Sequence, residues 1–281
     1  MDPTTRASIR SEINLDQGSE SDSSGGSPPD AGANGNPNTP PAPYIHPSNL
    51  PGAKRALRGI SIRSFLLGQA AGTCAIIAII LLYFSNALWR APLFVASLAI
   101  FHFLEFYITA SYNPLFATIT SFLLSSNGSA YHIAHTTALL ECILGRLFLP
   151  DSYFGWTSIL FGGVTAQVTI GLICMVVGQL VRNFAMVQAG WNFNHTIQRQ
   201  KRDDHVLVQT GIYSVLRHPS YFGFFWWAVG TQIMLGNSVS LLGYLVVLWQ
   251  FFSSRIESEL LTYPFHSSYV KNLADIIYFK K

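Results

Sequence analysis

The chain has 281 residues, of which 49% are hydrophobic and only 11% are charged, with a mean hydropathy of +0.31. This composition argues against an ordinary soluble domain and favours a lipid bilayer as the solvent for most of the chain. The net charge of +3 is unevenly placed, because residues 1–50 hold two arginines against six acidic residues. The basic excess therefore belongs to the hydrophobic part, which we expect to face an anionic lipid leaflet, and we predict no nucleic-acid partner.

Residues 1–50 are rich in Ser, Gly, Pro, Asn and Asp and contain almost no apolar side chains. Such a segment buries too little surface to offset the entropy lost on ordering, so we predict a disordered tail. A cleavable signal peptide needs an early apolar core after basic residues, and this segment has none. We divide the rest into membrane helices over 51–181 and a cofactor-binding loop, membrane hairpin and cytosolic end over 182–281.

Hydrophobic segments follow the tail over 64–84, 92–110, 131–149 and 156–181. Four basic residues between Lys54 and Arg63 precede the first, so the positive-inside rule places the N-terminus in the cytosol. The polar segment 182–217 carries five basic residues and belongs on the same side. An even number of crossings must precede that segment, which makes the charge-interrupted segment 131–149 the third span.

Two features within these spans have structural as well as functional interpretations. His102 and Glu105 lie three residues apart on one helical face, where pairing with each other or with another helix competes with a functional role. Small residues let helices approach closely in lipid, so we interpret two sets of glycines as packing positions. They are Gly68 and Gly72 in the first span, and Gly163, Gly171 and Gly178 in the fourth.

The last hydrophobic stretch, 222–252, is interrupted by Gly236-Asn237-Ser238 and predicts a helical hairpin. Its first half is about 14 residues, or about 21 Å of helix, against about 30 Å for the hydrocarbon core. Pro219 suits the first turn of a helix, and that helix start can hold an anionic group. Both ends of the hairpin return to the cytosolic side, which brings the preceding loop and Arg255 to one surface.

Several chemical motifs are missing from the sequence. It contains no GxGxxG, Walker or GxSxG pattern, so soluble nucleotide-binding folds and hydrolases of that kind have no support. His132 and His135 lack a third ligand nearby, and the histidines and aspartates from His195 to His205 match no metal site. We predict no metal. We interpret the three cysteines as small apolar residues: Cys74, Cys142 and Cys174.

A series of short motifs runs in one order along the C-terminal half. It comprises Asn192-Phe193-Asn194-His195, Gln198, His205-Val206-Leu207-Val208, Thr210-Gly211-Ile212-Tyr213, Arg217-His218-Pro219-Ser220-Tyr221-Phe222-Gly223, Gly230-Thr231-Gln232, and Arg255 with Glu257 and Glu259. In this series the chain resembles the isoprenylcysteine carboxyl methyltransferase family. Weaker similarity extends upstream through residues 101–106. The chain departs from the family at its end, where Ser258 interrupts the acidic run and His266 replaces a common glycine.

The hydrophobic segments and the positive-inside rule predict an all-α, polytopic membrane protein with about six transmembrane helices and both termini cytosolic, and the resemblance implies that it lies in the endoplasmic reticulum membrane. It implies methyl transfer from S-adenosylmethionine to the C-terminal carboxylate of a prenylated cysteine on CaaX-processed proteins such as small GTPases. The family's substrate-binding arginine falls on Arg255. Its cofactor positions fall on Gln198, His205, Val206, Leu207, Val208, Tyr213, His218, Pro219, Ser220, Tyr221 and Glu259.

Physical chemistry agrees with this activity. An α-carboxylate is already ionised at pH 7, so the reaction needs no general base. Arginine can grip a carboxylate through two donors, which assigns Arg255 to positioning. Two alternatives stay open: an NADPH-dependent membrane oxidoreductase of the sterol reductase kind, whose C-terminal half also contains Arg-His-Pro, and a non-catalytic membrane scaffold that works through the acidic tail.

Overall fold

The computed structural model describes residues 47–148, 158–193, 195 and 208–262, with side chains to residue 255. Every regular element in this part of the chain is helical, as predicted. The predicted disordered tail lies outside the described residues except at its end, where Pro47–Asn49 form a 3-10 turn.

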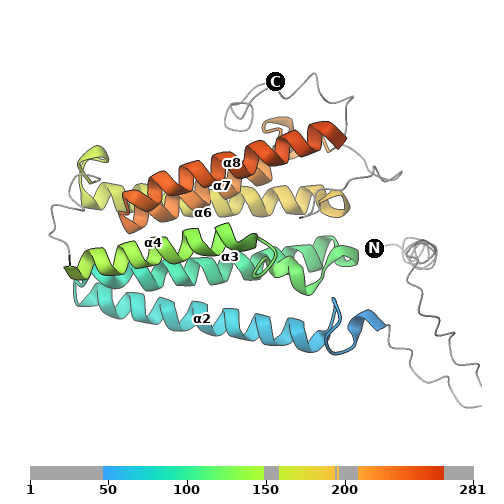
Figure 1. Cartoon of the computed structure of the whole chain (residues 1–281), viewed down its shortest axis with the longest axis horizontal. Coiled ribbons are helices and arrows are strands. Elements are labelled where there is room, and N and C mark those ends of the chain that lie inside the picture. Colours follow the sequence, from blue (N-terminus) through green and yellow to red (C-terminus); the bar gives the residue numbers. More distant parts are fainter. Residues whose placement is uncertain (1–46, 149–157, 194, 196–207, 263–281) are drawn as a thin grey trace, which may run out of the picture. The chain divides into compact units, whose positions relative to one another are not determined.

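Six long helices form the described part of the chain (Figure 1). They are α2 (Leu57–Tyr83), α3 (Arg90–Tyr112), α4 (Gly128–Phe148), α6 (Val164–Ala189), α7 (Pro219–Leu235) and α8 (Val239–Thr262). Three described segments are long and apolar enough to cross a membrane: Leu57–Tyr83, Ala87–Tyr112 and Val164–Asn192. The predicted spans over 131–149 and 222–252 correspond to helices, but their crossing of the bilayer stays a prediction.

The helix boundaries differ from the predicted ones in two places. Helix α2 begins at Leu57, before the predicted start at residue 64, because a helix continues past the hydrocarbon core and carries Arg58 and Arg63 at its polar end. Helix α6 begins at Val164 rather than near residue 156, because Gly163 precedes it with a φ of 119°. That dihedral lies in a region that glycine alone adopts readily.

Helices α6 and α7 pack with their backbones in direct contact at glycines spaced seven residues apart. A Cβ atom added to Gly178 of α6 would lie 2.4 Å from the backbone nitrogen of Trp227, and one added to Gly171 would lie 2.5 Å from that of Met234. On α7, a Cβ atom at Gly223 would lie 2.5 Å from the backbone nitrogen of Arg182. The predicted packing role of Gly171 and Gly178 is therefore confirmed.

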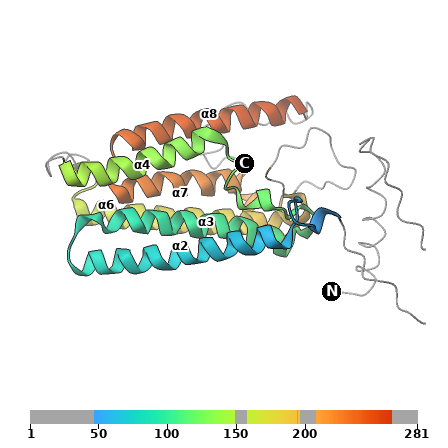
Figure 2. The ribbon, with the colours of Figure 1, turned by 60° about the horizontal axis from the view of Figure 1, so that its bottom comes forward.

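The other glycines predicted to allow close helix packing make no such contact in the described part of the chain. A Cβ atom at Gly68, Gly72 or Gly163 would meet no atom within 4 Å in the described part of the chain. Gly68 and Gly72 lie on α2, which packs beside α3 at one edge of the helices, whereas α8 lies at the opposite edge (Figure 2). The outer face of α2 exposes large apolar side chains, as expected for contact with lipid.

The turn between α7 and α8 is held by α3 and α4. Helix α7 ends at Gly236, whose φ of 78° lets the chain reverse. The Glu141 carboxylate of α4 accepts hydrogen bonds from three successive backbone N–H groups, those of Ser238 at 2.7 Å, Val239 at 3.0 Å and Ser240 at 2.7 Å. A carboxylate at this position caps the start of α8.

The opposite side of the same turn is also anchored. Arg90, at the start of α3, donates to the backbone oxygen of Leu235 at 3.3 Å. Asn237 donates to the backbone oxygen of Ala138 on α4 at 2.8 Å. Both donor side chains are buried. The short hairpin is therefore fixed at its tip by polar contacts to two other helices, and its open end carries the predicted site residues.

Candidate functional site

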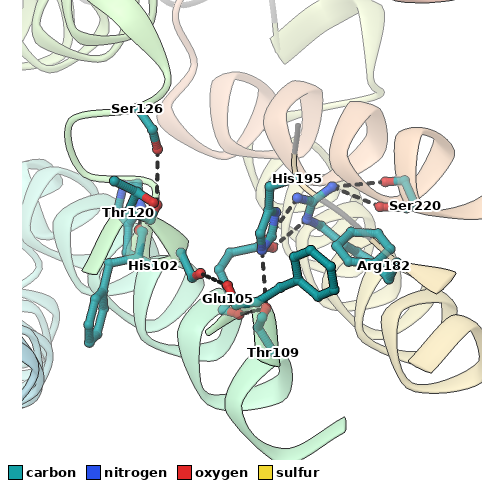
Figure 3. A network of polar contacts seen from close by, with 12 residues as sticks. His102, Glu105, Thr109, Thr120, Ser126, Arg182, His195 and Ser220 are labelled. Carbon is teal, nitrogen blue, oxygen red and sulfur yellow. Dashed lines mark hydrogen bonds and ion pairs between the residues drawn. The ribbon is translucent and has the colours of Figure 1, made fainter. Parts of the chain in front are cut away.

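A buried ion pair joins α3 to α6 near the open end of the hairpin (Figure 3). Arg182 donates through Nε to Glu105 Oε1 and through Nη2 to Glu105 Oε2, the latter at 2.9 Å. Glu105 is 0% exposed and Arg182 is 8% exposed. Removing two charges from water is costly, so a buried pair needs good geometry and further hydrogen bonds to persist.

Arg182 also makes those further contacts. Its Nη1 donates to the Ser220 backbone oxygen at 3.2 Å and to Ser220 Oγ at 3.0 Å. Its guanidinium carbon lies 5.5 Å from the Phe101 ring centre and 5.4 Å from that of Phe224. Arg182 thus connects the intramembrane carboxylate to the first turn of α7, which contains predicted cofactor residues.

Three buried polar side chains at the C-terminal end of α3 hold the segment that follows α6. Glu105 and Thr109 lie on one face of α3, and Asn113 is the residue that follows the helix. We call these three residues, which are spaced four apart, the α3 ladder. Thr109 Oγ1 lies 3.1 Å from His195 Nε2, and Glu105 Oε2 lies 3.6 Å from His195 Nδ1. Asn113 donates to the backbone oxygen of Phe193 at 2.8 Å.

The hydrogen bonds of Thr109 assign the tautomer of His195. The single hydroxyl proton of Thr109 is donated to the Glu105 backbone oxygen at 2.7 Å. The hydroxyl oxygen then accepts from His195, which places the imidazole proton on Nε2. Burial lowers the pKa of His195 to about 4, against an ordinary 6.5, so the ring is neutral at pH 7.

Arg255 of α8, the predicted substrate arginine, lies beside this segment. Its Nη1 donates to the His195 backbone oxygen at 3.0 Å, and its guanidinium carbon lies 5.1 Å from the Phe251 ring centre. Arg255 as a whole residue is partly exposed. It is therefore held on one side and can meet a ligand on another.

The predicted cofactor residues that are described lie at the same end of the helices. Tyr213 donates to the backbone oxygen of Ala185 on α6 at 3.1 Å, and burial raises its pKa to about 12. The 3-10 turn around it, Gly211–Ser214, is fixed by a 2.8 Å hydrogen bond from the Ile212 backbone nitrogen to Gln188. Val208 precedes this turn and is partly buried.

The first turn of α7 begins at Pro219, as predicted, with His218 as the capping residue. The His218 and Tyr221 rings stack at 5.5 Å with an interplanar angle of 8°, and Tyr221 also contacts Phe252 of α8 at 5.3 Å. Ser220 is buried on Arg182. Flat stacked rings and a helix start are the groups that suit an adenine and a carboxylate, respectively.

Some of the predicted site residues are not among those that the structure describes. Gln198, His205, Val206 and Leu207 lie outside the described residues, and Glu259 lies on α8 with its side chain outside them. Their cofactor roles stay predictions. The described part of the chain contains no group of three or more histidine, cysteine or acidic side chains placed to hold a metal ion.

The pairing options for His102 and Glu105 are resolved. Glu105 pairs with another helix through Arg182, whereas His102 contacts the Phe122 backbone oxygen at 2.9 Å and the Tyr131 hydroxyl at 3.1 Å. Sequence reasoning missed Thr109, Asn113 and Arg182 as site residues. The available signal was the polar spacing of the α3 ladder at the end of an apolar helix.

Comparison with known proteins gives consistent matches. A sequence model of the isoprenylcysteine carboxyl methyltransferase family matches residues 170–262. Protein-S-isoprenylcysteine O-methyltransferase of Saccharomyces cerevisiae is 47% identical over 167 residues, covering 59% of this chain and 68% of the relative. The enzyme of the same name from Xenopus laevis is 39% identical over 208 residues, covering 73% and 67%.

A solved structure is also similar. It is described as the eukaryotic intramembrane Ras methyltransferase isoprenylcysteine carboxyl methyltransferase. The match has a TM-score of 0.63 and 30% identity, and it covers 79% of this chain and 78% of the other. The similarity therefore extends well beyond the C-terminal motifs.

Proposed function

The chain belongs to the isoprenylcysteine carboxyl methyltransferase family and is an O-methyltransferase of isoprenylcysteine, and we propose that S-adenosylmethionine is its methyl donor at the cytosolic membrane face. The acceptor is the C-terminal carboxylate of a prenylated cysteine, and CaaX-processed proteins such as small GTPases are the proposed substrates. The product is a methyl ester.

The observation that carries the proposal is the position of Arg255. One of its nitrogens is held by the His195 backbone oxygen, and the residue is partly exposed at the end of the helices where α7 begins. A guanidinium held in this way offers its remaining N–H donors to a carboxylate in a planar, two-point geometry. It orients one carboxylate oxygen toward the methyl group without supplying transition-state charge.

The described residues fit the proposed cofactor. S-adenosylmethionine, when bound, supplies an electrophilic methyl group on a sulfonium centre. The His218 and Tyr221 rings are flat and stacked, as suits an adenine, and within the described residues no side-chain hydrogen bond caps the first turn of α7, which suits a carboxylate. The reaction brings a cation and an anion together into neutral products, so exclusion of water by the surrounding apolar side chains favours it.

The cytosolic location rests on the basic start of α2. Arg55 donates to the backbone oxygen of Leu115, and the Ile119 backbone nitrogen donates to that of Lys54 at 2.8 Å. These contacts join the basic segment to the chain that follows α3, the same end that carries Asn113 and Arg255. The positive-inside rule then places the site on the cytosolic side, in an endoplasmic reticulum protein whose six long helices enter the bilayer.

The direct test is label transfer in membranes that contain the full chain. Methyl-labelled S-adenosylmethionine and a farnesyl-cysteine analogue are mixed, and base-labile label on the analogue is counted. We expect transfer by the wild-type chain and little by Arg255→Ala. Absence of transfer together with binding of NADPH would favour the oxidoreductase alternative and contradict the proposal.

A further inference from the structure

Arg255 is positioned by a main-chain atom of another segment as well as by the Phe251 ring of its own helix. Its Nη1 donates to the backbone oxygen of His195 at 3.0 Å. A backbone oxygen has no rotamer of its own, so its location depends on whatever fixes residue 195. A contact from outside α8 therefore contributes to the position of the acceptor-binding guanidinium.

The contacts that fix residue 195 come from the α3 ladder. The ring of His195 rests between Thr109 Oγ1 at 3.1 Å and Glu105 Oε2 at 3.6 Å, and Asn113 fixes the preceding chain through the Phe193 backbone oxygen at 2.8 Å. The three ladder residues are 0%, 4% and 2% exposed in chain order. Burying polar and charged groups near a membrane is costly, and intramembrane ionisable residues are retained mainly where they serve function.

We propose that His195, seated by Thr109, is a positioning residue that fixes Arg255 for the prenylcysteine carboxylate. This inference rests on the proposed function. The His195 ring donates from Nε2 to Thr109, which holds the ring, and the backbone oxygen of the same residue holds one edge of the Arg255 guanidinium. The other edge is turned to the acceptor.

The assigned tautomer makes the proposal specific to one nitrogen. His195→Gln places an amide donor close to the position of Nε2 and preserves the bond to Thr109, whereas His195→Ala removes it. Thr109→Ser keeps the accepting hydroxyl and Thr109→Val deletes it at nearly constant volume. Each pair therefore contains one variant that keeps the hydrogen bond and one that loses it.

The KM for the acceptor and the dissociation constant for the cofactor distinguish a positioning role from general damage to the fold. We expect His195→Ala and Thr109→Val to raise the KM for a farnesyl-cysteine analogue about five- to tenfold, the scale of one lost hydrogen bond. The dissociation constant for S-adenosylmethionine should stay within about twofold, and His195→Gln and Thr109→Ser should stay close to wild type.

The matched control lies on the same helix. The Ser111 hydroxyl donates to the backbone oxygen four residues earlier at 2.8 Å, as the Thr109 hydroxyl does at 2.7 Å, but Ser111 is exposed. Ser111→Ala therefore removes a comparable hydroxyl without touching His195. We expect its acceptor KM to equal that of the wild-type chain.

A double-mutant cycle tests whether His195 acts through Arg255. Methyl transfer is measured with enzyme in excess, so that weak turnover is still counted. If the proposal holds, His195→Ala slows the wild-type chain but adds no further loss to Arg255→Ala. The proposal would be overturned if the losses from His195→Ala and Arg255→Ala were additive. It would also be overturned if the variants changed the acceptor KM and the cofactor dissociation constant equally.

Misfolding and failure of the proposed function have separate signatures. If His195→Ala does not fold, the milder Thr109→Val and Thr109→Ser pair decides the question on its own, because an unchanged acceptor KM in Thr109→Val also overturns the proposal. If the wild-type chain transfers no methyl group, the proposed function has failed, and that result is seen before any variant is compared.

Discussion

At the scale of single residues, two arginines near the site differ in how many of their guanidinium nitrogens bond to the protein. Arg182 directs Nε and Nη2 to Glu105 and Nη1 to Ser220, so its nitrogens serve the protein. Within the described residues, Arg255 makes one hydrogen bond, through Nη1 to His195. This difference supports the proposed structural role of Arg182 and the proposed binding of the acceptor by Arg255.

Arg255→Ala should therefore remove acceptor binding and leave the cofactor site intact. We expect methyl transfer to fall by about 100-fold, the scale of a lost charge-assisted bidentate contact, with little change in S-adenosylmethionine affinity. The measurements are the acceptor KM and a cofactor binding titration. A loss of cofactor affinity with unchanged acceptor affinity would contradict the assigned role.

Glu105→Ala leaves the Arg182 guanidinium buried without its counter-charge. Breaking a buried pair from one side costs about 3–5 kcal/mol, so the thermal unfolding midpoint in detergent should fall sharply. Replacing both partners, as Glu105→Leu with Arg182→Met, should recover part of the loss because no lone charge stays buried. Unfolding at the wild-type temperature in Glu105→Ala would argue against the ion pair.

His195 predicts a pH dependence of stability. Its pKa is lowered from 6.5 in the unfolded chain to about 4 in the fold by burial, so its contribution is fully present above pH 6.5 and is lost as the pH falls toward 4. Glu105, Arg182 and Arg255 are the charged groups that face it. The difference in unfolding midpoint between wild type and His195→Gln, followed from pH 7.5 to 4.5, should shift in favour of the variant as the pH falls. A constant difference would show that the ring does not resist protonation.

Single residues also show which parts of the site could be predicted from the sequence. Tyr213, His218 and Arg255 belong to contiguous motifs, so they were predicted as site residues from the family resemblance. Thr109 and Arg182 act through partners 86 and 77 residues away. The polar spacing of the α3 ladder is visible in the sequence, but no local pattern encodes its partners, which emerge only from the fold.

At the scale of helices, the contact between α6 and α7 depends on glycine. The backbone atoms of one helix occupy the space that a side chain would need on the other, at Gly178 and Gly223 among others. Backbone atoms cannot rotate aside as a flexible side chain can. The hairpin carrying the site is thus placed against α6 at van der Waals distance.

Gly178→Ala should separate the two helices, because its Cβ atom would lie 2.4 Å from the Trp227 backbone nitrogen. We expect a destabilisation of about 1–3 kcal/mol, typical of overpacking, seen as a lower unfolding midpoint in detergent. Gly68→Ala on α2 is the control, since a Cβ atom there meets nothing within 4 Å. Equal behaviour of the two variants would contradict close packing at Gly178.

Helix ends were predictable where proline and glycine mark them. Pro219 begins α7 and Gly236 ends it, as the sequence indicated. The predicted start of the first helix, residue 64, lies after its start at Leu57 in the structure, because hydropathy reports the apolar part of a helix and not its polar extension. The role of Glu141 was not predictable, because the charge that interrupts α4 caps a different helix.

At the scale of the whole described chain, three segments have the length and composition of membrane spans, at 57–83, 87–112 and 164–192. Hydropathy identifies these because much of their surface is apolar and outward-facing. Helices such as α4 and α7 face other helices on several sides and carry buried polar groups, so composition alone does not establish whether they cross.

Acceptor-site glycosylation tests the proposed orientation. A short inserted loop with a glycosylation sequence is placed either after Phe84, between α2 and α3, or after Gly52, before α2. We expect modification of the first and not of the second, because the basic start of α2 stays cytosolic. The reverse pattern would move the site to the luminal side.

The anchored turn between α7 and α8 has a further consequence for the shorter arm of the hairpin. Its 17 residues correspond to about 25 Å of helix, less than the thickness of the acyl region. Glu141 accepts from three backbone amides at the bend and Arg90 donates to the Leu235 carbonyl, so these backbone groups need no bulk water. A luminal protease should find no cleavable peptide at residues 236–238, and the chain can stop short of the far headgroups with these backbone groups satisfied.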